Sequence, residues 1–270
     1  MNTFAALDIH VSIAAQEVFS IGSFSVTNAM LTGLFGLAIT LIIMFYVARR
    51  VKNGKYNRFV GLFQWVFEGL LKQVDDIIPD RKLARKVAPL AITIFFFTLI
   101  NYWLSVIPGL ETISVNGVPL LRSLAADLNY TIGIALITMV TVQIYAVKHL
   151  GVFGNAGRYL RNPFKDPVGA FEGILELIGE VSRGSALALR LFGNAFAGEV
   201  LLIVIAVLTG LLSTAVLPFF MAFELFIGFI QSYVFFVLTL MFTSLAVAHH
   251  SEPSPDHSPA VATEKVKQTG

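Results

Sequence analysis

Long apolar stretches alternate with short basic segments along the first half of this chain. The first apolar stretch runs from 26 to 48 without a charged residue, and the second and third run from 87 to 107 and from 128 to 147. A helix of about 20 apolar residues crosses a hydrocarbon core of about 30 Å. The pattern therefore predicts three membrane-crossing helices in this half.

Two further apolar elements, 170–211 and 216–248, are too long for a single upright crossing. As a helix the first would be about 63 Å long at about 1.5 Å per residue, twice the hydrocarbon thickness. The residues from Thr209 to Thr214 between them are typical of a turn. We therefore predict a long tilted hairpin at about 170–248, which brings the number of crossings to five.

Residues 59–79 have a mixed pattern, with apolar side chains at helical spacing interrupted by charged ones such as Glu68, Lys72 and Asp75. This pattern is typical of an amphipathic helix that lies on a membrane surface. The predicted fold class is all-α, a polytopic membrane protein of five crossing helices and one interfacial helix.

Basic residues are grouped at the same ends of the predicted crossings. Because Lys and Arg are enriched on the cytoplasmic side of membranes, we predict an outside N-terminus and a cytoplasmic C-terminus. The predicted organisation is an extracytoplasmic segment 1–25, one membrane domain 26–248 and a disordered, proline-containing cytoplasmic tail 249–270. The basic groups are Arg49, Arg50, Lys52, Lys55 and Arg58; Lys82, Arg85 and Lys86; and Lys148, His149, Arg158, Arg161 and Lys165.

Composition supports the membrane class, since 56% of residues are hydrophobic and 13% are charged. A formal charge of +2 is too small to suggest a nucleic-acid partner, and the absence of cysteine excludes disulfides and thiolate sites. The sequence has no HExxH, GxSxG or GxxxxGK[ST] motif. We therefore expect no metal, no cofactor and no catalytic activity of the chain itself.

The stretch from 172 to 202 is apolar enough for lipid but carries ionisable residues, which at membrane depth usually mark an ion or substrate path. On a helix at about 100° per residue, five of its polar residues fall within about 80° of one another, while a sixth points about 140° from Glu176. The five are Glu176, Glu180, Arg183, Arg190 and Asn194, and the sixth is Glu199.

Arg190 is the strongest candidate among them. A guanidinium does not lose its proton in proteins, so it cannot relay protons but holds a permanent charge that favours the ionised form of a carboxylate nearby. This property suits a gate. The alternatives are an internal salt bridge with Glu180 or Glu176, or a side chain that reaches the membrane interface.

Glu199 and Glu224 form a second candidate set, with Gln231 two turns after Glu224 on the same face. Neighbouring carboxyls in a low dielectric can take up and release protons near neutral pH. The alternative is a hydrogen bond between helices in which one acid stays protonated.

The remaining polar residues are less specific. Glu176 and Glu180 could line an exit to the cytoplasm or be solvated at the interface. Asn194 could orient Arg190 or fill the seam between helices, and Asp127 could cap the third crossing helix or line a vestibule.

The segment LALRLFGNAFAGEVL at 187–201 resembles the signature of subunit a of the rotary F-type ATP synthase. The resemblance extends to the basic exit of the first crossing, the DLNYT segment at 127–131, Gln231 and the FFVLTLMF run. It implies that Arg190 is the stator arginine that faces a ring of c subunits, with Asn194 beside it. Relatives vary in which of two hairpin positions carries His; here both, Glu199 and Glu224, are acids.

The resemblance further implies two half-channels that load and unload protons on the ring carboxylates, with Arg190 preventing a short circuit. Glu199 and Gln231 would line the outer path and Glu176 the inner path. The implied partners are the c-subunit ring, the b-subunit peripheral stalk and the remaining ATP synthase subunits, in the plasma membrane of a bacterium.

Other functions stay open from the sequence. A stand-alone proton-coupled carrier could bind an anionic substrate at Arg190, although no internal repeat supports it. A membrane redox enzyme is a more distant alternative, and sodium could replace the proton.

Overall fold

The computed structural model describes residues 14–22, 24–107, 114–115, 118–159 and 167–248. The predicted tail 249–270 and most of the segment 1–25 lie outside these residues. The described part is predominantly helical, which confirms that the protein is all-α. Its helices are α1 (Asn28–Lys52), α2 (Arg58–Ile77), α3 (Arg81–Val106), α4 (Leu128–Tyr159), α5 (Pro167–Thr209), the short 3-10 helix η1 (Gly210–Leu212) and α6 (Ser213–Ala248).

Four stretches are long and apolar enough to cross a membrane, so the chain is a multi-pass membrane protein. The first three fall on α1, α3 and α4, close to the predicted crossings. The fourth is a continuous stretch, Pro167–Val247, that contains both α5 and α6. The number of five crossings therefore stays a prediction, and so does the interfacial position of α2.

The helix ends follow local chemistry. Thr27 caps α1 by accepting a hydrogen bond from the Met30 backbone N–H at 3.3 Å, and Asn57 caps α2 by accepting one from Val60 at 2.8 Å. α1 is followed by Gly54 at φ +63°, a backbone angle that glycine adopts without strain. The predicted turn between the last two helices falls on η1, whose first residue, Gly210, has φ +50°.

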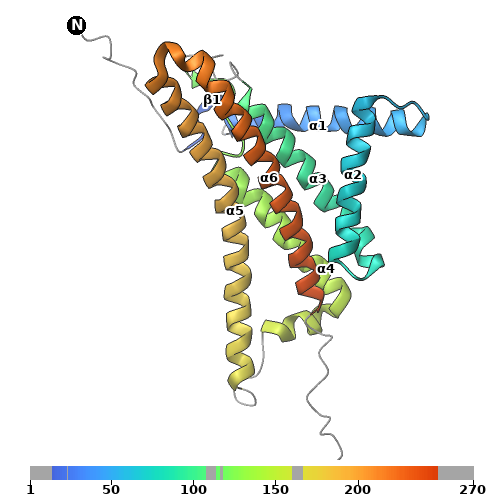
Figure 1. The fold of residues 1–270 in the computed structure, drawn as a ribbon. Helices are drawn as coiled ribbons and strands as arrows, with labels where there is room; N and C mark the ends of the chain where they lie inside the picture. Colours follow the sequence, from blue (N-terminus) through green and yellow to red (C-terminus); the bar gives the residue numbers. More distant parts are fainter. Residues whose placement is uncertain (1–13, 23, 108–113, 116–117, 160–166, 249–270) are drawn as a thin grey trace, which may run out of the picture.

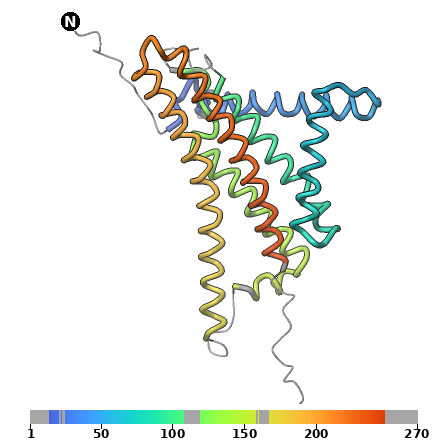
Figure 2. Tube along the Cα trace, in the orientation of Figure 1, coloured from blue at the N-terminus to red at the C-terminus, as the bar shows by residue number. Residues whose placement is uncertain are grey.

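The arrangement of the helices places α5 and α6 side by side as an inclined hairpin, with the turn at the top of Figure 1. α1 runs crosswise to this hairpin, and α2 stands at the far end of α1 from α5 (Figures 1 and 2). α5 has 43 residues and is therefore about 64 Å long. Because α5 lies crosswise to α1, the two helices cannot both stand upright in the bilayer.

The core lies where α3 and α6 meet. Phe95 of α3 packs edge-on against Phe229 and Phe236 of α6, and Tyr102 of α3 is fully buried. Large apolar side chains on the outward faces, such as Leu41 and Phe45 of α1, are exposed. Apolar residues on both faces are expected where one face packs on protein and the other on lipid.

Two features were not predicted from the sequence. α4 continues beyond the apolar stretch that ends at 147 and reaches Tyr159, with a break at Gly151, where φ is 78° and ψ is 162°. Two short hairpins also form, β1 (Glu17–Ile21) with β2 (Phe24–Thr27) and β3 (Ser114–Val115) with β4 (Val118–Pro119). Only the second lies between predicted crossings, in the loop before α4.

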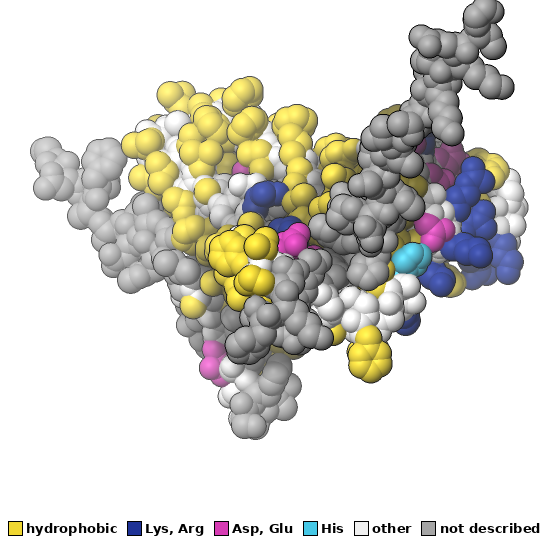
Figure 3. All heavy atoms as spheres, turned by 90° about the horizontal axis from the view of Figure 1, so that it is seen from below, with side chains coloured by type: hydrophobic (Ala, Val, Ile, Leu, Met, Phe, Trp, Pro, Cys, Tyr) yellow, Lys and Arg dark blue, Asp and Glu magenta, His cyan; other side chains and the backbone are white. Residues whose placement is uncertain are grey.

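Charge is distributed unevenly over the surface. Arg49, Arg50 and Lys52 occupy the last turn of α1, and Arg81 begins α3. Figure 3 shows most of the visible Lys and Arg side chains gathered at one side of the face it displays and others near its middle, while hydrophobic side chains dominate the opposite side. This separation agrees with basic residues that share one membrane surface.

Candidate functional site

Arg190 lies on the exposed face of α5. The buried residues of this stretch, Leu187, Ala188, Leu191 and Ala195, recur at helical spacing and pack against the rest of the protein. Arg190 therefore points away from that contact and is exposed. Between described residues, no carboxylate lies within ion-pair distance of Arg190, which leaves the internal salt bridge without support.

Asn194, one turn after Arg190, joins α5 to α6. Its side-chain amide donates a hydrogen bond of 2.8 Å to Oε1 of Gln231, which is buried. The sequence placed these two residues on separate helices of one hairpin, and the structure brings them together. Asn194 is thus fixed beside Arg190 by the neighbouring helix.

Glu224 lies buried where α3, α5 and α6 meet. The Tyr102 hydroxyl of α3 donates a hydrogen bond of 2.7 Å to Oε1 of Glu224. Gly198 of α5 faces the carboxylate so closely that a Cβ there would overlap its oxygens, and Gly228 makes room for the Tyr102 ring. Two glycines and one tyrosine therefore form a fitted site for this acid.

Glu199, the next residue on α5, has a different partner. Arg122, in the segment before α4, places Nε 3.5 Å from Oε1 of Glu199, and the side chains are only 8% and 15% exposed. The predicted pair of Glu199 and Glu224 is therefore served by two separate partners in the structure. The bond from Tyr102 to Glu224 joins two helices, as the alternative proposed, and the uptake and release of protons by the two acids stays a prediction.

Neither Arg122 nor Tyr102 was singled out from the sequence. Arg122 lies in a loop and Tyr102 near the end of a crossing helix, where an aromatic residue is common. Their partners are 77 and 122 positions away along the chain. A signal for Arg122 did exist, because it is a lone basic residue in an otherwise uncharged stretch between Glu111 and Asp127.

A polar cavity of about 150 Å³ lies near the start of α5, between α4, α5 and α6, and Glu176, Glu180 and Arg183 line it. Arg183 lies over the Phe242 ring of α6, with Cζ 5.8 Å from the ring centroid. Glu176 and Arg183 share the face of α5 that carries Arg190.

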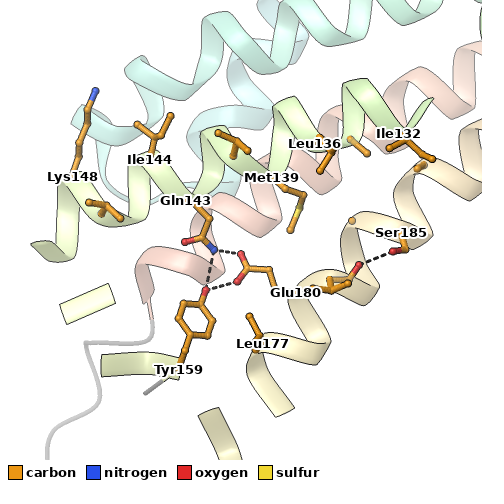
Figure 4. A pocket seen from close by; sticks show the side chains of 16 residues that line it. Ile132, Leu136, Met139, Gln143, Ile144, Lys148, Tyr159, Leu177, Glu180 and Ser185 are labelled. Atoms are coloured by element: carbon orange, nitrogen blue, oxygen red, sulfur yellow. Dashed lines mark hydrogen bonds between the residues drawn. The ribbon is translucent and has the colours of Figure 1, made fainter. Parts of the chain in front are cut away.

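Glu180 points toward α4 rather than toward Arg190. Its carboxylate accepts hydrogen bonds from the Gln143 amide and the Tyr159 hydroxyl, as Figure 4 shows. Tyr159 also accepts a hydrogen bond of 2.9 Å from Gln143. Glu180 is therefore held in a protein network rather than fully solvated at the interface.

The network closes one end of a larger cavity of about 790 Å³ between α4 and α5. Most of the lining is apolar, with Ile132, Leu136 and Met139 on the α4 side in Figure 4. The α5 residues that line it lie about 80–220° around the helix from Arg190, so most of the cavity opens away from the Arg190 face. The part of the chain that the structure describes holds no cluster of three or more metal-ligating side chains.

Asp127 caps α4, as one of the two sequence alternatives proposed. Its Oδ1 accepts a hydrogen bond of 2.9 Å from the Asn129 backbone N–H and a second one, of 3.2 Å, from the Asn129 side chain. The segment before the cap, from Arg122 to Ala126, is buried. The cap thus fixes the start of α4 next to the residue that contacts Glu199.

Comparison with known proteins gives a consistent result. Residues 30–244 match the family described as ATP synthase A chain. ATP synthase subunit a of Mycobacterium leprae (strain TN) is 31% identical over 230 residues, which cover 83% of this chain and 89% of that protein. The protein of the same name from Desulforamulus reducens is 36% identical over 224 residues, covering 80% of this chain and 78% of that protein.

Proposed function

This chain belongs to the ATP synthase A chain family. It is therefore a proton-translocating subunit of the ATP synthase membrane sector, and we propose that it forms two half-channels for protons. Each half-channel opens to one side of the membrane and ends at a ring of c subunits. Protons are loaded onto a ring carboxylate from one half-channel and unloaded into the other. The chain itself catalyses no reaction.

The observation that carries the proposal is the exposed and unpaired position of Arg190 on α5. A ring carboxylate that passes this surface meets a permanent positive charge with no carboxylate partner among the described residues. The charge favours the ionised carboxylate, so a carboxylate that has unloaded its proton passes Arg190 in the ionised form and returns to the loading half-channel. Protons cannot pass directly between the half-channels, because the guanidinium does not release a proton.

The outer half-channel involves the groups on the hairpin-turn side of Arg190. Glu199 lies nine residues after Arg190, or about 13.5 Å along the helix, and Glu224 and Gln231 face α5 from α6. These residues are buried or nearly buried polar groups within helices that are otherwise apolar. Such groups are expensive in a membrane and are retained where an ion must pass.

The inner half-channel involves the groups on the opposite side of Arg190. Glu176 lies 14 residues before Arg190, about 21 Å along the helix, and lines the small polar cavity with Glu180 and Arg183. The two acids are on the side from which α5 begins, after the basic segments. Arg190 therefore stands between an outer and an inner polar cluster along one helix.

The over-long hairpin fits a stator that contacts a ring. A strongly inclined α5 places the outer and inner polar clusters at different positions along the ring surface. A proton is then carried on a ring carboxylate from one cluster to the other. Each proton that crosses 100 mV releases about 2.3 kcal/mol, so several must cross for each ATP. The predicted partners are the c ring, the b-subunit stalk and the remaining ATP synthase subunits.

The proposed orientation follows the basic residues. The last turn of α1, the start of α3 and the end of α4 lie on the cytoplasmic side, and the turn at η1 lies outside. α2 then rests on the inner surface, with five crossings in all and a cytoplasmic C-terminus. The cell membrane of a bacterium is the proposed location.

Replacement of Arg190 tests the proposal in vesicles that contain the whole complex. Arg190→Ala is expected to abolish proton-driven ATP synthesis while the chain still assembles, because an exposed side chain contributes little to folding. Arg190→Lys is expected to fail as well, since an ammonium group can give up its proton. Leu189→Ala, which shortens an exposed neighbour, is the control and keeps synthesis. Normal synthesis by Arg190→Ala would defeat the proposal.

Two further measurements separate the alternatives. A stand-alone carrier would purify without a ring of small hairpin proteins, whereas the proposed subunit co-purifies with one. If ATP synthesis in vesicles depends on sodium, the transported ion is sodium rather than the proton, and the proposed role of Arg190 stays the same.

A further inference from the structure

Arg122 contacts Glu199 from a loop outside α5 and α6, and we infer that Arg122 is a positioning residue for Glu199. The inference rests on the proposed role of Glu199 in the outer half-channel. Arg122 Nε lies 3.5 Å from Glu199 Oε1, and both side chains are largely buried. The contact joins the segment before α4 to the middle of the long hairpin.

Arg122 is itself held in place by the outer part of the protein. Its Nη1 donates a hydrogen bond of 2.8 Å to the backbone carbonyl of Ala14, in the segment before β1. Its backbone N–H donates one of 3.0 Å to the hydroxyl of Thr32 in α1, and that hydroxyl donates to the carbonyl of Asn28. Two other parts of the chain therefore hold Arg122, the segment before β1 at the guanidinium and α1 at the backbone.

The two oxygens of Glu199 have different surroundings. Oε1 faces Arg122, whereas Oε2 is buried and has no hydrogen-bond partner among the described residues. A buried polar atom without a partner is rare and calls for an explanation. Arg122 holds the carboxylate by one oxygen and leaves the other oriented to accept a proton or a water molecule from the outer path.

Arginine is suited to this position because its planar fork can serve two partners at once. One nitrogen faces Glu199 while another donates to Ala14. A lysine carries the same charge but presents it as a point, so it can keep the ion pair and lose the second contact. A neutral side chain loses the ion pair and leaves the acid alone in a buried site.

The test uses vesicles with the whole complex, followed by removal of the catalytic sector to measure passive proton conduction through the membrane sector. The variants are Arg122→Gln, Arg122→Lys and Glu199→Gln, and the control is Arg58→Gln, which removes an exposed arginine at the start of α2. The amount of assembled chain is measured first by immunoblot, and conduction is divided by it. Arg122→Gln is expected to conduct at less than a tenth of the wild-type rate, and Arg122→Lys at a third or more.

The outcomes distinguish this inference from the proposed function. If Glu199→Gln conducts like the wild type, the proposed outer path fails and this inference with it. If Glu199→Gln conducts poorly but Arg122→Gln conducts normally, only the role of Arg122 is overturned. If Arg122→Gln does not accumulate, Arg122→Lys decides: conduction below a tenth overturns the inference, because the cation then does not restore Glu199.

Discussion

Gly198→Ala is the substitution whose effect follows most directly from the structure. Gly198 of α5 lies against the carboxylate of Glu224 on α6, and an added Cβ would overlap both carboxylate oxygens. The carboxylate cannot retreat easily, because it is buried and accepts a hydrogen bond from Tyr102 at 2.7 Å. One methyl group should therefore displace a proposed proton-path residue without changing its chemistry.

The expected cost can be worked out from three effects. Overpacking of a well-packed site costs about 1–3 kcal/mol, and loss of a hydrogen bond to a charged group costs about 1.5–3 kcal/mol. Replacing a helical glycine by alanine returns about 1 kcal/mol. The first two costs are alternatives, because the carboxylate either stays against the new methyl group or moves away and loses the bond to Tyr102, so the net cost to folding is about 0–2 kcal/mol. The overlap with both oxygens is too close to be accommodated in place, so the carboxylate has to shift while the protein stays folded.

ATP-driven proton pumping into inverted vesicles, measured with a pH-sensitive dye and normalised to assembled complex, reports the effect. We expect Gly198→Ala to pump at a tenth of the wild-type rate or less. Gly133→Ala is the matched control, because that helical glycine has open space around its Cβ position. Pumping by Gly198→Ala within twofold of the wild type would show that Glu224 does not need the placement seen here.

Three other substitutions test helix contacts, two of them at Tyr102 and one between α1 and α3. Tyr102→Phe should slow pumping several-fold with normal assembly, because it removes a hydrogen bond to Glu224 but keeps the ring; unchanged pumping would mean the bond is dispensable. Gly228→Ala should lower the amount of assembled chain, measured by immunoblot, because a Cβ would lie 2.5 Å from the Tyr102 ring, and full accumulation would contradict this packing. Gly36→Ala should weaken the contact of α1 with α3, because its Cβ would overlap the Asn101 side chain, and the chain should then be cleaved faster by added protease than the wild type.

The helices were accessible from the sequence because they depend on local pattern. Uninterrupted apolar stretches locate α1, α3, α4 and the final hairpin to within a few residues, except for the extension of α4 to Tyr159. Helical periodicity placed Arg190 on one side of its helix with Glu176 and Glu180, but it did not predict that Arg190 is exposed while Glu180 contacts α4. The turn at η1 follows from Gly210 and its polar neighbours.

The partners of the acids were not accessible, because they depend on contacts between distant parts of the chain. Periodicity says which side of α5 carries Glu199, but not that a loop before α4 brings Arg122 to it. In the same way, the position of Tyr102 near the end of α3 is typical of an interfacial residue, and only the fold shows that α6 brings Glu224 to its hydroxyl. Glu180 was assigned to two possible environments, and only the fold of α4 selects the network with Gln143 and Tyr159.

The crosswise placement of α1 and α2 has a mechanical consequence. In the proposed mechanism, a rotor that turns against α5 drags this chain sideways, and the resulting torque is resisted elsewhere in the subunit or its anchor. α2 stands at the far end of α1 from α5 (Figure 1), so it lies at the end of a lever arm. In the proposed orientation α1 crosses the membrane and runs along the rotor axis, so an anchor that grips α2 resists tilting of the subunit. For a given tilting torque, the restraining force at α2 falls as its distance from the rotor contact grows.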